Sequence, residues 1–294
     1  MSEVGFEGVF VPNVTPFKDG EIDEASLRRL VDYIIDAGAT GIVPSGTTGE
    51  CATLSHDEHI KIIEVVAEQV GGRVPVIAGI GTNSTRETLS LVERAEKFEL
   101  QGYLVVGPYY NRPSQEGIVE HFRAVSEATE VPVLIYNIPA RTGRNIEVDT
   151  VVELSRIPNI VGIKDASGDI NQTMNIIART DGFSVLAGED HLLFNICCLG
   201  GHGGILASAH VLPADFLSLC CATKEGDLEE ARRLHYRLLP LVRTMFKEPN
   251  PAPAKAALRL LGVIDSDELR LPLMSVSAAC REDMAGVLHG LKLL

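Results

Sequence analysis

Short apolar runs alternate with longer segments of helical periodicity along most of this 294-residue chain. Eight such runs are rich in β-branched residues, and they begin at Gly8, Thr40, Val74, Gly102, Val131, Ile160, Phe183 and Gly203. Runs of this kind are typical of strands buried on both faces of a parallel sheet, with helices as the connections. Eight strand–helix units favour a closed barrel over an open sheet, which usually has fewer strands. The pattern therefore predicts an α/β fold, a (β/α)₈ TIM barrel.

The expected helices begin at recognisable capping residues. Asp23, Ser55 and Ser84 each stand directly before a periodic segment, where their side chains can accept hydrogen bonds from free backbone amides. Ser55 and Glu58 have the spacing of a capping box. Gly71 stands where the second helix should end, because glycine adopts the left-handed conformation that closes a helix.

The strand–helix alternation stops near residue 224. Residues 227–246, residues 252–261 and the segment near the C-terminus have helical patterns with no strand between them. We predict a catalytic barrel domain over residues 1–224 and a C-terminal helical extension over residues 225–294.

The composition narrows the range of partners. The net charge of −14 disfavours contact with phosphate backbones and anionic lipids, so we expect neither nucleic acid nor membrane as a partner. No apolar run approaches the roughly 20 residues that span a bilayer. The N-terminal sequence MSEVGFEGVF has no basic region followed by an apolar core, so we expect no signal peptide. The six cysteines form no C-x-x-C pair, which indicates reduced thiols in a cytoplasmic protein.

On a barrel of this kind, chemistry is found at the carboxyl ends of the strands and in the loops that follow. Polar residues at these positions are Ser45, Thr47, Thr48, Glu50, Tyr109, Tyr110, Asn111, Arg112, Tyr136, Asn137, Arg141, Lys164, Asp165, Glu189 and Asp190. We therefore expect the functional site among them.

Lys164 ends the sixth predicted strand, where both faces of the sheet should be buried. Because burial of an unpaired ammonium group is costly, the pKa of this lysine should fall. A neutral amine can form a Schiff base with a carbonyl substrate. The alternative is a structural ion pair with Asp165 or Glu189, although Asp165 should face the other side of the strand. Spacing alone leaves both interpretations open.

Three other features could complete a carbonyl site, although each has an ordinary structural explanation. Tyr136 ends the strand beside Lys164, where its phenol could carry protons or could be a satisfied core hydroxyl. Thr47 and Thr48 lie in a glycine-flanked turn whose backbone amides could bind a carboxylate. Arg141 could grip a carboxylate through two hydrogen bonds or could be a solvated surface residue.

Two further patterns favour structure over chemistry. The sequence GGHGG at 200–204 precedes its strand, so it lacks the context of a phosphate-binding loop and predicts a tight turn. His56 and His59 stand three residues apart on one expected helix, which is not a metalloprotease spacing. We interpret them as a solvated helix start and predict no metal site.

Taken together, the motifs resemble the dihydrodipicolinate synthase family, which belongs to the superfamily of N-acetylneuraminate lyase and class I pyruvate aldolases. The matching segments are GTTGE at 46–50, PYYNRPSQEG at 108–117, YNIPARTG at 136–143, GIKDASGD at 162–169 and AGED at 187–190. The similarity runs from about Gly5 to the C-terminus, and five ordered motifs are far more specific than any one of them.

The resemblance implies a Schiff-base mechanism. Lys164 would form an imine with pyruvate, and Thr47, Tyr136 and Tyr110 would relay protons, with Tyr110 reaching into the site of a neighbouring subunit. The protonated imine acts as an electron sink, so no metal, pyridoxal phosphate or other cofactor is required. The family is usually a homotetramer built as a dimer of dimers.

The resemblance also assigns the substrates. Thr48 and the main chain of Ile205 would hold pyruvate, and Arg141 would bind the carboxylate of L-aspartate 4-semialdehyde. Condensation of the two would give 4-hydroxy-tetrahydrodipicolinate, on the path to diaminopimelate and lysine.

Some members of the family bind L-lysine as a feedback inhibitor at the interface of the tight dimer. The matching positions here are Cys51, Ala52, Leu54, His56, His59, Asn83, Glu87 and Tyr109. Cys51 departs from the serine expected there, which bears on the strength of inhibition.

Two alternatives differ in substrate or in class. N-acetylneuraminate lyase and 2-keto-3-deoxy sugar acid aldolases share the lysine, the tyrosine and the pyruvate half-reaction. They generally lack an arginine at the place of Arg141 and the YYNRP segment, and both are present here. A non-catalytic pyruvate- or lysine-binding regulator on a decayed aldolase scaffold should have lost at least one of five residues, and all five are present here: Lys164, Tyr136, Thr47, Tyr110 and Arg141.

Overall fold

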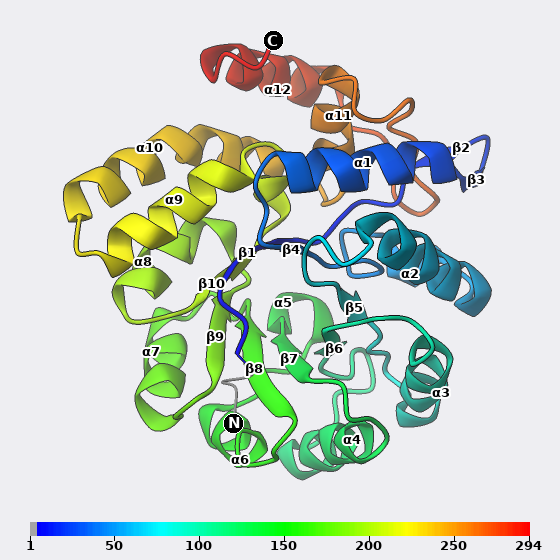
Figure 1. The fold of residues 1–294 in the computed structure, drawn as a ribbon, viewed down its shortest axis with the longest axis vertical. Coiled ribbons are helices and arrows are strands. Elements are labelled where there is room, and N and C mark those ends of the chain that lie inside the picture. Colours follow the sequence, from blue (N-terminus) through cyan, green and yellow to red (C-terminus); the bar gives the residue numbers. More distant parts are fainter. Residues whose placement is uncertain (1–4) are drawn as a thin grey trace.

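The computed structural model describes residues 5–294 and confirms the predicted barrel with its C-terminal helices (Figure 1). Eight parallel strands form one sheet in the order β4-β1-β10-β9-β8-β7-β6-β5. A parallel bridge between Ile42 and Val76 joins the two ends of this sheet and closes the barrel. The strands are β1 (Gly8–Val11), β4 (Gly41–Ile42), β5 (Ile77–Gly79), β6 (Gly102–Val106), β7 (Val133–Asn137), β8 (Ile160–Asp165), β9 (Ser184–Ala187) and β10 (Gly203–Ile205).

Helices surround the barrel on the outside (Figure 1). They are α1 (Glu24–Asp36), α2 (His56–Val70), α3 (Thr85–Ala95), α4 (Gln115–Glu127), α6 (Val148–Leu154), α7 (Ile170–Arg179), α8 (Leu193–Cys198) and α9 (Pro213–Lys224). The short helix α5 (Pro139–Thr142) follows β7 and lies inside this ring. The predicted caps are confirmed: Asp23, Ser55 and Ser84 each accept a backbone amide, and Ser55 with Glu58 forms a capping box. Gly71 ends α2 in the left-handed conformation.

The helical extension consists of α10 (Leu228–Met245), α11 (Ala252–Leu260) and α12 (Ala278–Gly290). α10 lies against α9, and α11 lies against α12. Leu238 of α10, Leu258 of α11 and Met284 of α12 are buried in the same hydrophobic cluster as Val11 and Ile42 of the barrel strands. The extension therefore shares one hydrophobic cluster with the barrel. The domain boundary at residue 224 stays a prediction.

The barrel interior is packed with side chains from successive strands. Phe10, Ile77, Leu104, Leu134, Leu186 and Ile205 form one buried cluster there. Two further clusters fill the space between the strands and the helices. Because both faces of every strand are covered, an ionisable side chain on the inner face is removed from water unless it lies at the barrel mouth.

A small antiparallel hairpin, β2 (Phe17–Lys18) and β3 (Glu21–Ile22), is absent from the eight predicted strands. Its two-residue turn is Asp19-Gly20, with φ of 53° and 84°, and Asp-Gly is the sequence signal for such a turn. The Glu268 carboxylate of the extension accepts both turn amides, at 3.0 and 2.7 Å. The hydrophobic pattern does not predict these strands, because a strand of two residues is too short to form an apolar run.

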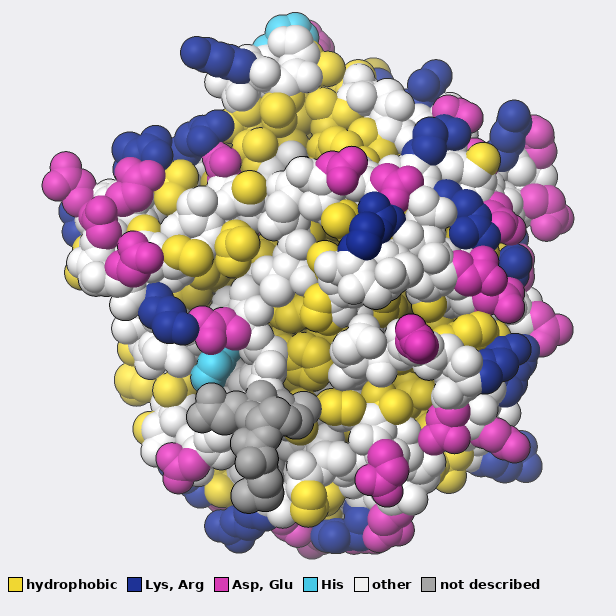
Figure 2. Space-filling model, in the orientation of Figure 1, with side chains coloured by type: hydrophobic (Ala, Val, Ile, Leu, Met, Phe, Trp, Pro, Cys, Tyr) yellow, Lys and Arg dark blue, Asp and Glu magenta, His cyan; other side chains and the backbone are white. Residues whose placement is uncertain are grey.

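The surface carries charges of both signs. On the face drawn in Figure 2, Lys and Arg side chains stand beside Asp and Glu around the rim, with hydrophobic side chains between them. Among the described residues, no helix is long and apolar enough to cross a membrane. Residues 1–4 lie outside the described residues. Part of the segment on which the expected absence of a signal peptide rests lies there, and so does the start of the predicted domain 1–224.

Candidate active site

A cavity of about 220 Å³ lies at the carboxyl ends of the barrel strands. It brings together six of the seven residues predicted to be catalytic or substrate-binding, namely Thr47, Thr48, Tyr136, Arg141, Lys164 and Ile205. The other residues around it are Pro12, Ile138, Ala140, Gly188, Glu189, Asp190, Ala207, Phe246 and Asn250. Tyr110 is the predicted residue that this cavity does not include.

Lys164 and Tyr136 are neighbours across two strands. Their Cα atoms are register partners in the β7–β8 pair, so both side chains point into the barrel. The Lys164 Nζ lies 4.1 Å from the centroid of the Tyr136 ring. Both residues are only 6% exposed. The amine is therefore held against an aromatic face at the floor of the cavity.

Burial lowers the pKa of Lys164 to about 8, and the Arg141 guanidinium acts in the same direction. The carboxylates of Asp190 and Glu189 oppose this fall as nearby charges. Roughly one amine in ten is then neutral at pH 7, against about one in several thousand for an ordinary lysine. Lys164 is thereby suited to attack a carbonyl carbon at neutral pH.

The alternative ion pair with Asp165 does not form. Asp165 faces the outer side of β8, where its carboxylate accepts hydrogen bonds from Asn137 at 3.1 Å and from Thr173 at 2.7 Å. Asn137 and Asp165 are register partners, as are the residues before them, Tyr136 and Lys164. The outer hydrogen bond therefore helps to fix the two strand ends that place the phenol beside the amine.

The Tyr136 phenol stays protonated in this setting. Its burial raises the pKa of the hydroxyl well above the ordinary value, although the neighbouring Thr47 hydroxyl and Arg141 oppose the rise. A protonated phenol close to a hydroxyl and an amine can give a proton and take it back during carbonyl chemistry.

The loop after β4 supplies Thr47 and Thr48. Its backbone is strained, because Ser45 and Glu50 have φ of 56° and 58°, which residues other than glycine rarely adopt. The Thr48 side chain is buried, and its Oγ1 accepts a hydrogen bond of 3.0 Å from Asn250 Nδ2. This hydrogen bond joins the loop to the segment between α10 and α11.

Residues 5–290 match the sequence model of the dihydrodipicolinate synthetase family. The chain belongs to this family. It is 49% identical to the 4-hydroxy-tetrahydrodipicolinate synthase of Syntrophobacter fumaroxidans over 277 residues, which are 94% of this chain and 95% of that protein.

Solved structures of the family have the same fold. Dihydrodipicolinate synthase from Thermotoga maritima matches with a TM-score of 0.95 at 42% identity, over 98% of this chain and 99% of that one. Dihydrodipicolinate synthase from Cyanidioschyzon merolae, solved with lysine bound, matches with a TM-score of 0.95 at 38% identity, over 98% and 99%.

Within this dihydrodipicolinate synthetase fold, Arg141 stands at the rim of the cavity, and Tyr110 lies outside it. Arg141 is exposed on α5 and borders the cavity, as its loop position predicted. Tyr110 is 89% exposed and has a φ of 72°, and its amide donates to the Thr142 carbonyl at 3.3 Å. Its phenol is therefore presented outward from the chain that carries it.

The positions that match the family's lysine site gather beside the same loop. Burial raises the pKa of the Cys51 thiol to about 11. Burial raises the pKa of Tyr109, and the nearby Cys51 and Glu87 groups act in the same direction. Asn83 is half-buried, and its carbonyl accepts a hydrogen bond of 2.8 Å from Asn111.

The interpretation of both histidines as a solvated helix start is wrong for His59. His56 is exposed, but His59 is 6% exposed and its Nε2 lies 2.6 Å from the Gly79 carbonyl. Burial lowers its pKa. The side chain packs between α2 and β5, so it anchors the helix and is not on the surface. In the turn before α2, Ala52 is exposed and Leu54 is half-buried.

Several residues of the site gave no signal in the sequence pattern. Glu50 and Lys255 form an ion pair whose side chains are 0% exposed, and the Lys255 Nζ also donates to the Glu268 carbonyl at 2.7 Å. The amide of Arg270 donates to Glu50 at 3.2 Å. Lys255 lies in α11, and no sequence motif includes it. The threonine loop is thus anchored to the extension by a buried charge pair.

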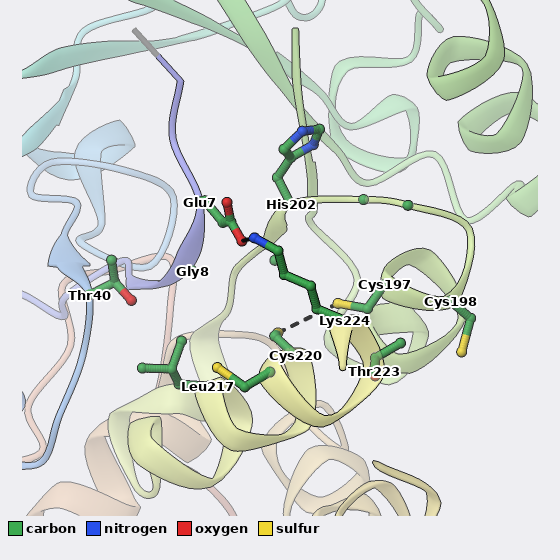
Figure 3. A pocket seen from close by; sticks show the side chains of 14 residues that line it. Glu7, Gly8, Thr40, Cys197, Cys198, His202, Leu217, Cys220, Thr223 and Lys224 are labelled. Atoms are coloured by element: carbon green, nitrogen blue, oxygen red, sulfur yellow. Dashed lines mark hydrogen bonds and ion pairs between the residues drawn. The ribbon is translucent and has the colours of Figure 1, made fainter. Parts of the chain in front are cut away.

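A larger cavity, of about 710 Å³, lies at the opposite end of the barrel, where β1 and β10 begin (Figure 3). Figure 3 shows Lys224 reaching Glu7, at 2.6 Å, and Cys197 pointing toward Cys220, at 3.5 Å. Catalytic residues of these barrels come from the other end of the strands. The smaller cavity also holds the buried amine, so we assign the active site to it.

The glycine-rich segment lies next to this larger cavity. Gly200 and Gly203 have φ of 94° and 114°, which confirms the predicted tight turn between α8 and β10. In residues 5–294, no group of three His, Cys, Asp or Glu side chains is arranged as metal ligands.

Proposed function

We propose that this chain condenses pyruvate with L-aspartate 4-semialdehyde, the reaction of a 4-hydroxy-tetrahydrodipicolinate synthase, a lyase of the diaminopimelate route to lysine. The observation that carries the proposal is the buried Lys164 amine, whose pKa falls to about 8 beside the Tyr136 phenol. The cavity of about 220 Å³ suits small carboxylic acids and not a long ligand. A synthase of this name at 49% identity supports the choice of substrates.

The first half-reaction uses the barrel floor. The neutral Lys164 amine attacks the keto carbon of pyruvate, and the Tyr136 phenol, next to Thr47, moves the protons that convert the carbinolamine into water and an imine. The backbone and hydroxyl of Thr48 hold the pyruvate carboxylate, with the main chain of Ile205 along the same wall. Loss of a methyl proton then gives an enamine, the carbon nucleophile.

The second half-reaction uses the rim. Arg141 grips the carboxylate of the semialdehyde, because a guanidinium matches a carboxylate with two hydrogen bonds. The enamine attacks the aldehyde carbon, and the substrate's own amine then displaces Lys164 from the imine and closes the ring. The lysine is released unchanged, so one site carries out repeated turnovers.

The outward position of Tyr110 supports an assembled enzyme, in which this phenol completes the proton relay of a neighbouring subunit. We propose a homotetramer made of two tight dimers, with Tyr110 and Tyr109 at the tight-dimer contact. Sedimentation velocity measures the assembly directly. If Tyr110 acts across the contact, Tyr110→Phe lowers kcat and leaves the sedimentation coefficient unchanged.

A substrate panel tests the proposed reaction. Pyruvate with L-aspartate 4-semialdehyde should turn over, whereas N-acetylneuraminate and 2-keto-3-deoxygluconate should not be cleaved at comparable enzyme concentration. Cleavage of either sugar acid at the higher kcat/KM would transfer the assignment to the related aldolases. Binding of pyruvate with no turnover of any substrate would identify a regulator.

The pH dependence of the pyruvate half-reaction follows from the lowered pKa of Lys164. We expect kcat/KM for pyruvate to rise about tenfold per pH unit on the acid side and to level off near pH 8, because only the neutral amine attacks. Since the Asp190 carboxylate raises this pKa, Asp190→Asn should move the acid limb to lower pH. An acid limb near pH 10, or one displaced upward in Asp190→Asn, would contradict this account.

Millimolar L-lysine is expected to inhibit the chain, since the chain has residues that match the family's lysine site and Cys51, Asn83 and Glu87 are near enough to Tyr109 to shift its pKa. The measurement is the initial rate as lysine is titrated at fixed substrate concentrations. L-leucine at equal concentration is the control, because it has the same amino-acid head and lacks the ε-ammonium. A rate that stays flat with lysine rules this site out.

A further inference from the structure

Asn250 reaches the active site from the helical extension. It stands between α10 and α11, borders the cavity, and is 8% exposed. Its Nδ2 donates to the Thr48 Oγ1 at 3.0 Å, across 202 residues of sequence. The sequence motifs contain no member from this part of the chain.

The direction of this hydrogen bond constrains the Thr48 hydroxyl. A hydroxyl has one proton and two acceptor lone pairs. Because Asn250 occupies a lone pair as the donor, the proton of Thr48 stays available to an acceptor on the other side. Among the hydrogen bonds of residues 5–294, this is the one in which the Thr48 hydroxyl takes part. Thr48 lines the cavity, so this proton can be donated to a ligand bound there.

The other end of the Asn250 amide shows that the fold alone does not satisfy this side chain. Its Oδ1 is buried and has no hydrogen-bond partner among the described residues. A buried carbonyl left without a partner costs free energy. If the amide were turned around, Oδ1 would take the Thr48 proton and remove it from the cavity.

We propose that Asn250 is a positioning residue, which directs the Thr48 hydroxyl proton to the carboxylate of the keto acid. The inference rests on the proposed function, because that function makes Thr48 a ligand of pyruvate. Asn250 acts through Thr48 and touches neither the imine carbon nor the transferred protons. Its loss should therefore weaken keto-acid binding and leave the chemical steps and the semialdehyde site nearly unchanged.

The first test compares Asn250→Ala with Asn250→Asp. We expect Asn250→Ala to raise the KM for pyruvate about fivefold, with kcat and the KM for the semialdehyde within about twofold. Asn250→Asp has nearly the same shape, but its carboxylate can only accept, so it captures the Thr48 proton and repels the substrate carboxylate. Its KM for pyruvate should rise roughly tenfold or more. The excess over Asn250→Ala should shrink as the pH falls and the new carboxyl group becomes protonated.

The second test asks whether Asn250 acts through Thr48. In a Thr48→Val background, Asn250→Ala should produce no further rise in the KM for pyruvate, because the hydroxyl that it orients is gone. An equal rise in both backgrounds overturns the proposal, as does a fall in kcat with the KM unchanged. If Asn250→Ala does not fold, the near-isosteric Asn250→Asp gives the same comparison.

The two levels of the proposal fail in different ways. A wild-type protein that neither turns over pyruvate nor forms a borohydride-trapped adduct with it refutes the proposed function. A wild-type protein that does both, together with Asn250 variants whose KM for pyruvate is unchanged, refutes only the role of Asn250.

Discussion

Lys164→Ala is expected to lower turnover by about a thousandfold or more and to abolish covalent trapping of pyruvate by borohydride. Without the amine, no imine forms, and the electron sink that stabilises the pyruvate carbanion is lost. The cavity and the groups that bind the pyruvate carboxylate remain, so weak binding of pyruvate should persist. The measurements are steady-state kinetics and peptide mass mapping after reduction.

Lys61→Ala is the matched control, because Lys61 is an exposed lysine on α2, paired with Glu64 at 3.2 Å. In wild type and in this control, the reduced adduct should lie on the peptide that contains Lys164. An adduct on another lysine, or full turnover by Lys164→Ala, would show that a different group does the chemistry. The second result would also remove the basis for the predicted acid limb near pH 8.

Lys255→Met is expected to lower the free energy of unfolding by about 3–5 kcal/mol. The two side chains of the Glu50–Lys255 pair are 0% exposed, so removal of the ammonium leaves a buried carboxylate without its counter-charge. The Lys255 ammonium also lies 4.3 Å from the centroid of the Phe17 ring. Equilibrium urea denaturation at one fixed protein concentration measures the change, since assembly makes stability depend on concentration.

The double variant Lys255→Met/Glu50→Gln separates the pair from the packing. It removes both charges, so it should recover much of the stability that Lys255→Met loses. Lys61→Met, which breaks an exposed pair, should change stability by less than about 1 kcal/mol. If the single and double variants lose equal free energy of unfolding, packing of the Lys255 side chain matters more than its charge.

The Lys255→Met variant should also lose activity beyond its loss of folded protein. Glu50 ends the segment that carries Thr47 and Thr48, and its backbone is held in the left-handed conformation. Because Glu50 belongs to this loop and Lys255 to α11, their buried charge pair couples the extension to the threonines of the active site. Activity measured well below the unfolding transition should show a higher KM for pyruvate.

The strands, the caps and the place of Lys164 follow from local sequence. Apolar runs, capping serines and glycine stops depend on residues a few positions apart, and these neighbours are set before the chain folds. The lysine at the end of a buried strand could be found in the same way. The Asp19-Gly20 hairpin was also encoded locally, but its strands are too short to form a pattern.

Tertiary structure decided what these residues can do. The pKa of Lys164 depends first on burial and then on Asp190, Glu189 and Arg141, which two different loops bring to one cavity. His59 is buried because β5 lies against its helix, although its sequence spacing suits a surface. Asn250 meets Thr48, and Lys255 meets Glu50, across more than two hundred residues. Periodicity determines which face of an element is buried, whereas the choice of partner depends on which surfaces finally pack together.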